Sequence, residues 1–208
     1  MENENIVKVL QNLRKQEKRK FEQTIDLIVN LNKFDIKRDS VNIFTELPHP
    51  IKTKKICAFF EVRNEHVDTV TASEFAKYSD KKLLKKLEQQ YEFFIAQASL
   101  MPKVATTFGR VLGQKGKMPS PQLGVLFNVD EKGVKELLAK INRSIKLRTK
   151  EASIKIPIGK EGMKDEEIAE NIASVQQALL KALPKGKDNI KNMLVKFTMS
   201  KPEKVLFA

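Results

Sequence analysis

The segment Met101–Gly124 combines basic side chains with glycine and proline in a pattern typical of anion binding. Between Glu92 and Asp130 the chain has no carboxylate, and the basic residues of this window are Lys103, Arg110, Lys115 and Lys117. Glycines let a backbone approach a ligand closely, and three lie among these side chains, at Gly109, Gly113 and Gly116. The pattern predicts a presented loop that binds an anion, with phosphate as the leading candidate.

Nucleotide-dependent enzymes bind phosphate with similar loops, so a nucleotide-dependent α/β enzyme is an alternative. The residues do not fit the known patterns. Gly116-Lys117 is followed by Met118 where a P-loop requires Ser or Thr, and Val111 stands where its first glycine would be. Gly109-x-x-x-Gly113 also lacks the spacing of a dinucleotide-binding loop. The enzyme therefore stays a second hypothesis, behind a nucleic-acid-binding protein.

Few other residues could act as catalysts or metal ligands. His49 and His66 are the only histidines, and the single cysteine, Cys57, lies in an apolar run that we expect to be a buried strand. No group of these residues has the spacing of a metal site. The sequence predicts no catalytic residue, no metal and no cofactor.

The charge balance favours an anionic partner. The chain has 39 Lys and Arg against 26 Asp and Glu, which gives a formal charge of +13 and suits nucleic acid or an anionic membrane surface. The N-terminal residues have no apolar signal-peptide centre, and no run approaches the roughly 20 apolar residues of a membrane span. A single cysteine suits a reducing compartment. We expect a soluble intracellular protein.

Basic side chains also gather in Arg14–Lys20, Lys132–Lys150 and Lys185–Lys204. Aromatic residues do not alternate with them as in single-strand binding platforms, which favours recognition of RNA shape and phosphates over base stacking. Phe21 is an exception, because it directly follows the first cluster at the start of an expected strand.

The two ends of the chain share an α+β pattern. Helical periodicity occurs in Ile6–Leu13 and Ile168–Leu179, and strand-like alternation occurs in Ile25–Leu31, Val41–Leu47, Ile154–Ile158 and Met193–Met199. One economical arrangement packs both ends together as one split domain, residues 1–52 and 149–208.

The middle of the chain, residues 53–148, has an α/β pattern. Ile56–Phe60 and Phe93–Ala96 are continuous apolar runs, typical of strands covered on both faces. A capping box at Thr71–Glu74 predicts the start of one helix. Further helices are expected over Lys81–Gln90, Met101–Val111 and Val134–Ile141. Ser144–Leu147 is expected to be a returning strand of this unit. We predict an inserted domain with a small, mostly parallel sheet.

The segment Phe93–Pro121 closely resembles the central motif of the ribosomal protein L1 family, especially its archaeal members. Further segments resemble family motifs in the family order: Lys20–Asp26 its first RNA-contact strand, Leu47–His49 its inter-domain entry, Pro157–Lys160 its return into the first domain, and Lys196–Ser200 its final contact strand.

The resemblance implies an α+β first domain split between both termini, with an inserted α/β Rossmann-like second domain. It implies a structural protein of the large ribosomal subunit that binds rRNA at the mobile stalk, assists release of deacylated exit-site tRNA, and represses translation of its own mRNA. It further implies a cytoplasmic ribosomal location, a monomer off the ribosome, no membrane and no cofactor.

The family's RNA-contact positions match a defined set of residues here. They are Lys20, Phe21, Glu22, Thr24, Asp26, Lys155, Lys196, Thr198, Met199 and Ser200. Carboxylates suit an RNA surface because they accept hydrogen bonds from 2′-hydroxyls. The basic segment of the inserted domain is expected to meet tRNA through Arg110, Lys115 and Lys117. The alternative is that this loop only packs its own domain, with Gly113 and Gly116 required for backbone geometry.

Three positions depart from the family pattern. Ser200 replaces a glycine in the final contact strand, which places a side chain where close backbone approach was available. Gln114-Lys115 replaces Pro-Arg, exchanging a forked guanidinium for a point charge. Pro50 replaces the glycine after His49 and stiffens the connection.

Overall fold

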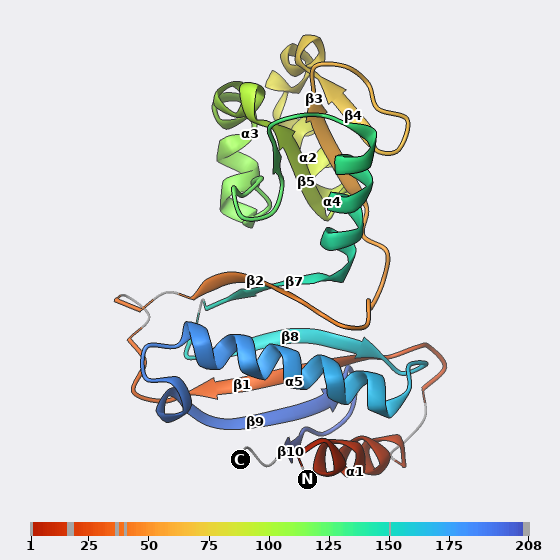
Figure 1. Cartoon of the computed structure of the whole chain (residues 1–208), viewed down its shortest axis with the longest axis vertical. Helices are drawn as coiled ribbons and strands as arrows, with labels where there is room; N and C mark the ends of the chain where they lie inside the picture. Colours follow the sequence, from red (N-terminus) through yellow and green to blue (C-terminus); the bar gives the residue numbers. More distant parts are fainter. Residues whose placement is uncertain (1, 16–18, 36–37, 40, 150, 206–208) are drawn as a thin grey trace. The chain divides into compact units, whose positions relative to one another are not determined.

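The computed structural model is a mixed α/β protein, and it describes residues 2–15, 19–35, 38–39, 41–149 and 151–205. It divides into two compact units: Met1–Ile51 with Arg143–Ala208 form unit 1, and Lys52–Asn142 form unit 2. Figure 1 shows the elements of both. Two residues of the expected basic clusters, Lys18 and Lys150, lie outside the described residues. None of the described helices is long and apolar enough to cross a membrane.

Unit 1 is built around a four-stranded antiparallel sheet in the order β10-β9-β1-β8. Its elements are α1 (Glu2–Arg14), β1 (Thr24–Leu31), β2 (Asn42–Glu46), β7 (Ser144–Arg148), β8 (Ser153–Lys160), α5 (Asp165–Ala182), η3 (Gly186–Asn189), β9 (Ile190–Phe197) and β10 (Glu203–Val205). A separate two-stranded ribbon pairs β2 with β7. The N-terminal strand β1 is therefore flanked on both sides by strands from the last third of the chain.

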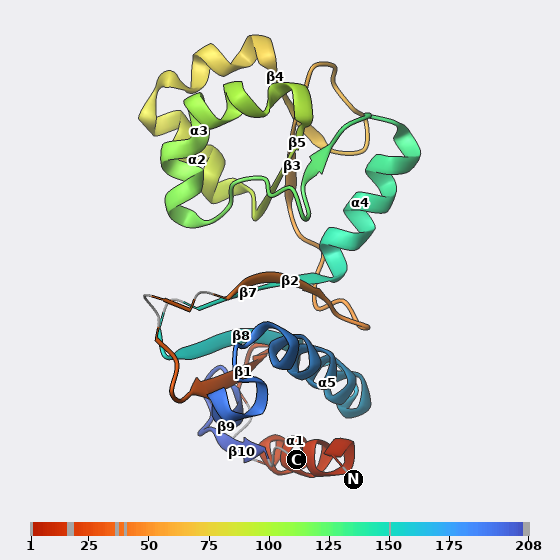
Figure 2. The same ribbon diagram turned by 60° about the vertical axis from the view of Figure 1, so that its left-hand side comes forward.

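The alternation read from the sequence determines which face of this sheet is covered. In β1 the residues Ile25, Leu27 and Val29 are completely buried, whereas the residues between them are half-exposed. Two views show α1 and α5 along one face of the sheet (Figures 1 and 2), and their apolar residues join the same core, among them Leu10 and Ile172. Burying these side chains supplies the main favourable term for folding.

Unit 2 holds a parallel sheet in the order β4-β3-β5-β6, as the apolar runs predicted. Its elements are β3 (Ile56–Phe60), β4 (Asp68–Thr71), η1 (Ala72–Ser79), α2 (Lys81–Gln90), β5 (Phe93–Gln97), η2 (Ala98–Leu100), α3 (Met101–Lys115), β6 (Val125–Leu126) and α4 (Glu131–Arg143). The expected capping box is present, because the Thr71 amide donates to Glu74 Oε2 at 3.1 Å, but it opens a 3-10 helix.

Helices cover both faces of the parallel sheet, which explains why β3 is buried at every position. On one face Phe59 and Phe94 pack with α2 and α3 around Phe108. On the other face Phe60 and Ile95 pack with α4. Figure 2 shows α2 and α3 on the side of the strands opposite α4.

The strand Ser144–Leu147 does not return to the parallel sheet, so that expectation was wrong. As β7 it pairs antiparallel with β2, Ile43 opposite Leu147, and both belong to unit 1. The chain therefore returns to unit 1 at Arg143, before Pro157–Lys160, which is part of β8. Periodicity shows that a segment is a strand but does not identify its partner.

The presented glycine loop was wrong for Gly113, whereas Gly109 lies within the helix expected over Met101–Val111. Gly109 and Gly113 lie inside helix α3, where a Cβ atom would meet nothing within 4 Å. Only Gly116 has the left-handed backbone that favours glycine, with φ of 70°, and it ends the helix. The helix continues through the glycines because Val104, Phe108 and Leu112 bury one face of it.

Lys117, expected to face an anion, binds its own unit instead. Its Nζ donates to the carbonyl oxygens of Glu88 at 2.6 Å and Tyr91 at 3.0 Å, at the C-terminal end of α2. The same Nζ pairs with the nearly buried Glu88 carboxylate at 2.8 Å. A cation satisfies the last carbonyls of a helix and stabilises its dipole, so Lys117 is a structural cap of α2.

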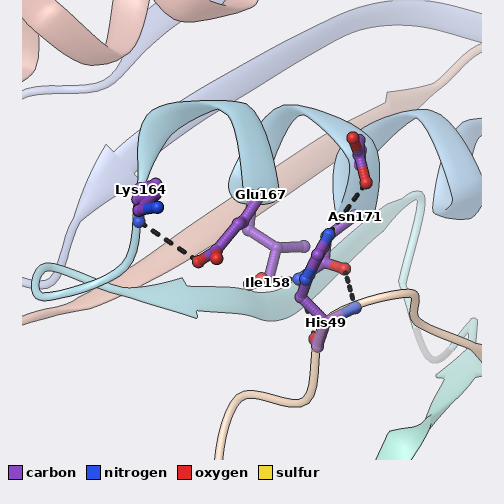
Figure 3. Close-up of polar contacts among 6 residues, drawn as sticks. His49, Ile158, Lys164, Glu167 and Asn171 are labelled. Atoms are coloured by element: carbon purple, nitrogen blue, oxygen red, sulfur yellow. Dashed lines mark hydrogen bonds and ion pairs between the residues drawn. The ribbon is translucent and has the colours of Figure 1, made fainter.

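A buried amide fixes the segment that leaves unit 1. Asn171 of α5 accepts from the His49 amide at 3.0 Å, and its Nδ2 donates to the carbonyls of His49 and Ile158, each at 3.0 Å. Figure 3 shows these bonds, with the Lys164–Glu167 capping contact at the start of the same helix. The His49 ring lies 2.8 Å from the Glu170 carboxylate. Asn171 thereby ties Leu47–His49 to β8.

Replacing Asn171 tests this clamp. Asn171→Leu keeps the size of the side chain but leaves the buried Ile158 carbonyl and two partly buried His49 groups unpaired. At roughly 1–3 kcal/mol for the first and about 0.5–1.5 kcal/mol for each of the others, we expect a loss of about 2–6 kcal/mol in unfolding free energy. Denaturant unfolding monitored by circular dichroism measures it. Ser174→Ala, which removes one exposed bond from α5 to the Glu46 carbonyl, is the control and should lose under about 1 kcal/mol. Equal losses in the two variants would contradict the clamp.

The two kinds of glycine in α3 should respond oppositely to alanine. Gly113→Ala should stabilise unit 2 by about 0.5–1 kcal/mol because the site is helical and open. Gly116→Ala should destabilise it by about 1–2 kcal/mol because alanine is strained in the left-handed region. Thermal melting of each variant against the parent protein gives both signs. If Gly113→Ala melted earlier than the parent, the helical assignment of that glycine would be refuted.

Candidate nucleic-acid interface

Three loops of unit 1 meet at one end of its sheet. Because β8 and β9 both run antiparallel to β1, their last residues lie beside its first residues, with Thr24 opposite Lys160 and Ile25 opposite Phe197. The segments that adjoin these strand ends are therefore neighbours. We call this surface the sheet-end surface; it comprises residues 20–24, 160–163 and 198–200.

Most of the residues predicted to contact RNA come together there. Lys20, Phe21, Glu22 and Thr24 lie in the first segment, and Thr198, Met199 and Ser200 lie in the third. Sequence reading placed Lys20–Asp26 and Lys196–Ser200 in strands, but β1 begins only at Thr24 and β9 ends at Phe197. Most of the contact candidates are thus loop residues that directly adjoin the end of a strand.

The other three candidates lie further along the sheet. Asp26 and Lys196 face each other across the pair of β1 and β9, two residues inward from the sheet end on β1. Burial raises the pKa of the Asp26 carboxyl, and the charge of Lys196 partly offsets this rise. Lys155 stands opposite Ile28 and pairs with Glu151 at 3.3 Å, so it is the candidate most distant from the three loops.

Two large apolar side chains are exposed on the sheet-end surface. Phe21 is 53% exposed and Met199 is 60% exposed, although both belong to a protein with a well-formed core. Exposed apolar side chains among polar neighbours typically mark a binding surface. A Phe ring and a Met thioether can pack on the flat faces of bases or on ribose.

Hydrogen bonds fix the backbone of the third segment. The Thr198 amide donates to the Thr24 carbonyl at 3.0 Å, and the Thr24 amide donates to Thr198 Oγ1 at 3.2 Å. Ser200 Oγ accepts from the Phe197 amide at 2.8 Å, so the serine side chain closes the turn. The hydroxyl of Thr198 is therefore part of the scaffold as well as a contact candidate.

Sequence reading missed a second set of residues that organise this surface: Gln23, Lys160, Glu161 and Arg14. The buried Gln23 accepts from the Met199 amide through Oε1 at 3.2 Å. Lys160 Nζ lies 2.9 Å from the Glu22 carboxylate and neutralises its charge. Polar residues in a polar stretch give no periodic signal, so only the pairing of distant strands reveals their roles.

Arg14 anchors the loop after β8 from the end of helix α1. Its Nη1 and Nη2 donate to the carbonyls of Glu161 and Met163, both at 2.7 Å, and its Nε donates to Asp165 at 2.8 Å. The planar guanidinium suits three such acceptors at once. The residue predicted as part of a basic cluster is therefore engaged within the protein.

Unit 2 presents basic side chains on α3 and a buried thiol at Cys57. Arg110 and Lys115 are exposed on α3, whereas Lys117 caps α2 as described above. Burial and the nearby Asp68 carboxylate raise the pKa of the Cys57 thiol to about 12, so it stays a neutral thiol at ordinary pH. Within the described part of the chain, no group of three or more His, Cys, Asp and Glu side chains could hold a metal ion.

Comparisons with known proteins agree with the resemblance read from the motifs. A model of the Ribosomal protein L1p/L10e family matches residues 13–201. The large ribosomal subunit protein uL1 of Nanoarchaeum equitans is 36% identical over 203 residues, covering 93% of this chain and 95% of that protein. The uL1 protein of Pyrobaculum calidifontis is 37% identical over 208 residues, covering 95% and 91%.

A more distant relative matches over nearly its whole length. The uL1 protein of Methanothermococcus thermolithotrophicus is 30% identical over 217 residues, covering 99% of both chains. These relatives are structural proteins of the large ribosomal subunit and not enzymes, which removes the nucleotide-dependent enzyme from consideration. The chain belongs to the ribosomal protein L1 family.

Proposed function

We propose that this protein is a structural constituent of the large ribosomal subunit and binds large-subunit rRNA of the mobile stalk through its sheet-end surface. In this proposal unit 1 is the split rRNA-binding domain, and unit 2 is the inserted Rossmann-like domain. The observation that carries the proposal is the pair of exposed apolar side chains, Phe21 and Met199, on adjacent loops that hydrogen bonds hold in place.

The chemistry around this pair suits RNA. Lys20 is exposed and supplies positive charge for phosphates. The Glu22 carboxylate, which Lys160 keeps from repelling phosphates, can accept hydrogen bonds from 2′-hydroxyl groups. Two apolar side chains on loops with fixed backbones, framed by donors and acceptors, suit the shape of a folded RNA, whereas a purely basic patch would bind any duplex.

Two further roles rest on the family resemblance. We propose that the protein lies beside the exit-site tRNA and assists release of deacylated tRNA, with Arg110 and Lys115 of unit 2 as the tRNA contacts. Lys117 is withdrawn from that set because it caps α2. We also propose that the sheet-end surface binds a stalk-like structure in the protein's own mRNA and represses its translation.

Phe21 should contribute strongly to the affinity for rRNA. Phe21→Ala should weaken binding of a stalk rRNA fragment by about 1–3 kcal/mol, the usual value of an aromatic contact with a base. The chain offers a matched control in Phe127→Ala, since Phe127 is 84% exposed on unit 2. That variant should bind like the parent. Filter-binding or calorimetric titration at a single salt concentration makes the comparison.

The same titration separates a specific from a general RNA binder. A specific protein prefers the stalk fragment over a random duplex at matched salt, and Phe21→Ala reduces that preference. Equal loss of affinity in the Phe21 and Phe127 variants, or equal affinity of the parent for both RNAs, would overturn the proposed interface.

Charge removal on α3 should leave the primary site intact. Arg110→Gln combined with Lys115→Gln should change the affinity for the stalk fragment by less than about twofold. For ribosomes carrying exit-site tRNA, the slope of log affinity against log salt should fall by about 0.7–0.9 for each tRNA phosphate that the variant no longer neutralises. Lys117→Met should instead lower the melting temperature, because it removes the cap of α2. An unchanged salt slope for the double variant would exclude Arg110 and Lys115 as tRNA contacts.

A further inference from the structure

We propose that Gln23 is a positioning residue for RNA binding, which holds the Met199 peptide so that the Met199 side chain and Phe21 present one preformed apolar contact. This inference rests on the proposed function, because it assigns a role within the sheet-end surface. Gln23 itself is only 3% exposed and is withdrawn from solvent.

Gln23 links all three loops of the surface. Its side-chain Oε1 accepts from the Met199 amide at 3.2 Å. Its backbone carbonyl accepts from the Glu161 amide at 2.9 Å, and its own amide donates to Glu161 Oε2 at 3.2 Å. The residue therefore contacts the segment after β8 through its backbone and the segment after β9 through its side chain.

The rest of the turn is held independently of Gln23. Thr198 is tied to Thr24, and the Ser200 hydroxyl is tied to Phe197. Loss of the Gln23 acceptor would leave these bonds and the pairing of β1 with β9 in place. The change is therefore confined to the peptide that sets the direction of the Met199 side chain.

The position of Gln23 in the chain couples this turn to Phe21. Phe21 and Gln23 are separated only by Glu22, whose carboxylate Lys160 holds at 2.9 Å. Phe21 and Met199 lie near opposite ends of the chain, yet the same short segment supports both. A binding surface fixed before RNA arrives loses less conformational entropy on binding, which raises affinity.

Gln23→Met tests the idea, because methionine has nearly the same shape but only a weak acceptor. We expect the affinity for a stalk rRNA fragment to fall about 5–20-fold, the equivalent of one hydrogen bond removed, with a melting temperature within a few degrees of the parent. Amide hydrogen exchange at Met199 should become faster, while exchange at Thr198 should not change. A large fall in the melting temperature would make Gln23 an ordinary core residue and overturn the proposal.

A double-mutant cycle with Met199→Ala measures whether Gln23 affects RNA binding through Met199 or only through the stability of the fold. If Gln23 acts through Met199, Gln23→Met should have less than about a twofold effect in the Met199→Ala background, because coupled residues are not additive. Additive losses, or no loss from Gln23→Met alone, would overturn the inference. If neither Met199→Ala nor Phe21→Ala weakened binding, the proposed interface itself would fail, and the two failures are thus distinguishable.

Discussion

The pairing of β1 with β8 on one side and β9 on the other is the constraint on which unit 1 depends. A strand from the start of the chain is hydrogen-bonded along its length to two strands from the end of the chain. This pairing aligns Ile25, Leu27 and Val29 in one buried row beneath α1 and α5. It also sets the register that brings Thr24, Lys160 and Phe197 to the same end of the sheet. The same strand pairing therefore positions both the core and the candidate interface.

Buried amide side chains hold the loops that strand pairing does not fix. Asn171 holds the segment at His49, Gln23 holds the turn at Met199, and Asn189 donates to the carbonyls of Asn32 and Lys33 while accepting from the Lys185 amide at 2.7 Å. Each satisfies backbone groups of a loop that has no strand partner, as buried polar groups must be satisfied. Unit 1 thus fixes these loops largely by internal polar side chains, and the exposed Lys160–Glu22 ion pair contributes little to stability.

The sequence predicted local structure well because apolar periodicity is a local property. The helices α1, α2 and α5 and the strands β1, β3 and β5 fall where alternation or helical spacing placed them. The errors concern information that the local pattern does not contain. The partner of Ser144–Leu147 depends on distant packing, and Gly113 is helical, beyond the expected end at Val111, because Leu112 packs in the core of unit 2 with Val104 and Phe108.

The candidate site likewise combines residues that the sequence identified with residues that only the structure revealed. Motif resemblance identified side chains that reach outward, such as Phe21 and Met199, and the structure brings them together. It did not identify Gln23 or Arg14, whose partners lie 138 or more positions away in the chain. It also assigned Lys117 to an external anion, because a basic residue near glycines has the same signature whether it meets a phosphate or the carbonyls of a neighbouring helix.

The place of β1 between two late strands has a consequence for the synthesis of the protein. A chain emerging from a ribosome presents β1 long before β8 and β9 exist, so the central strand of unit 1 must wait without partners. Unit 2 is contiguous in sequence and can fold during this interval. The turn at Met199 arises only when the last segment has been translated. The candidate interface therefore exists only on chains that have been translated through Ser200, and a product terminated before that residue would lack it.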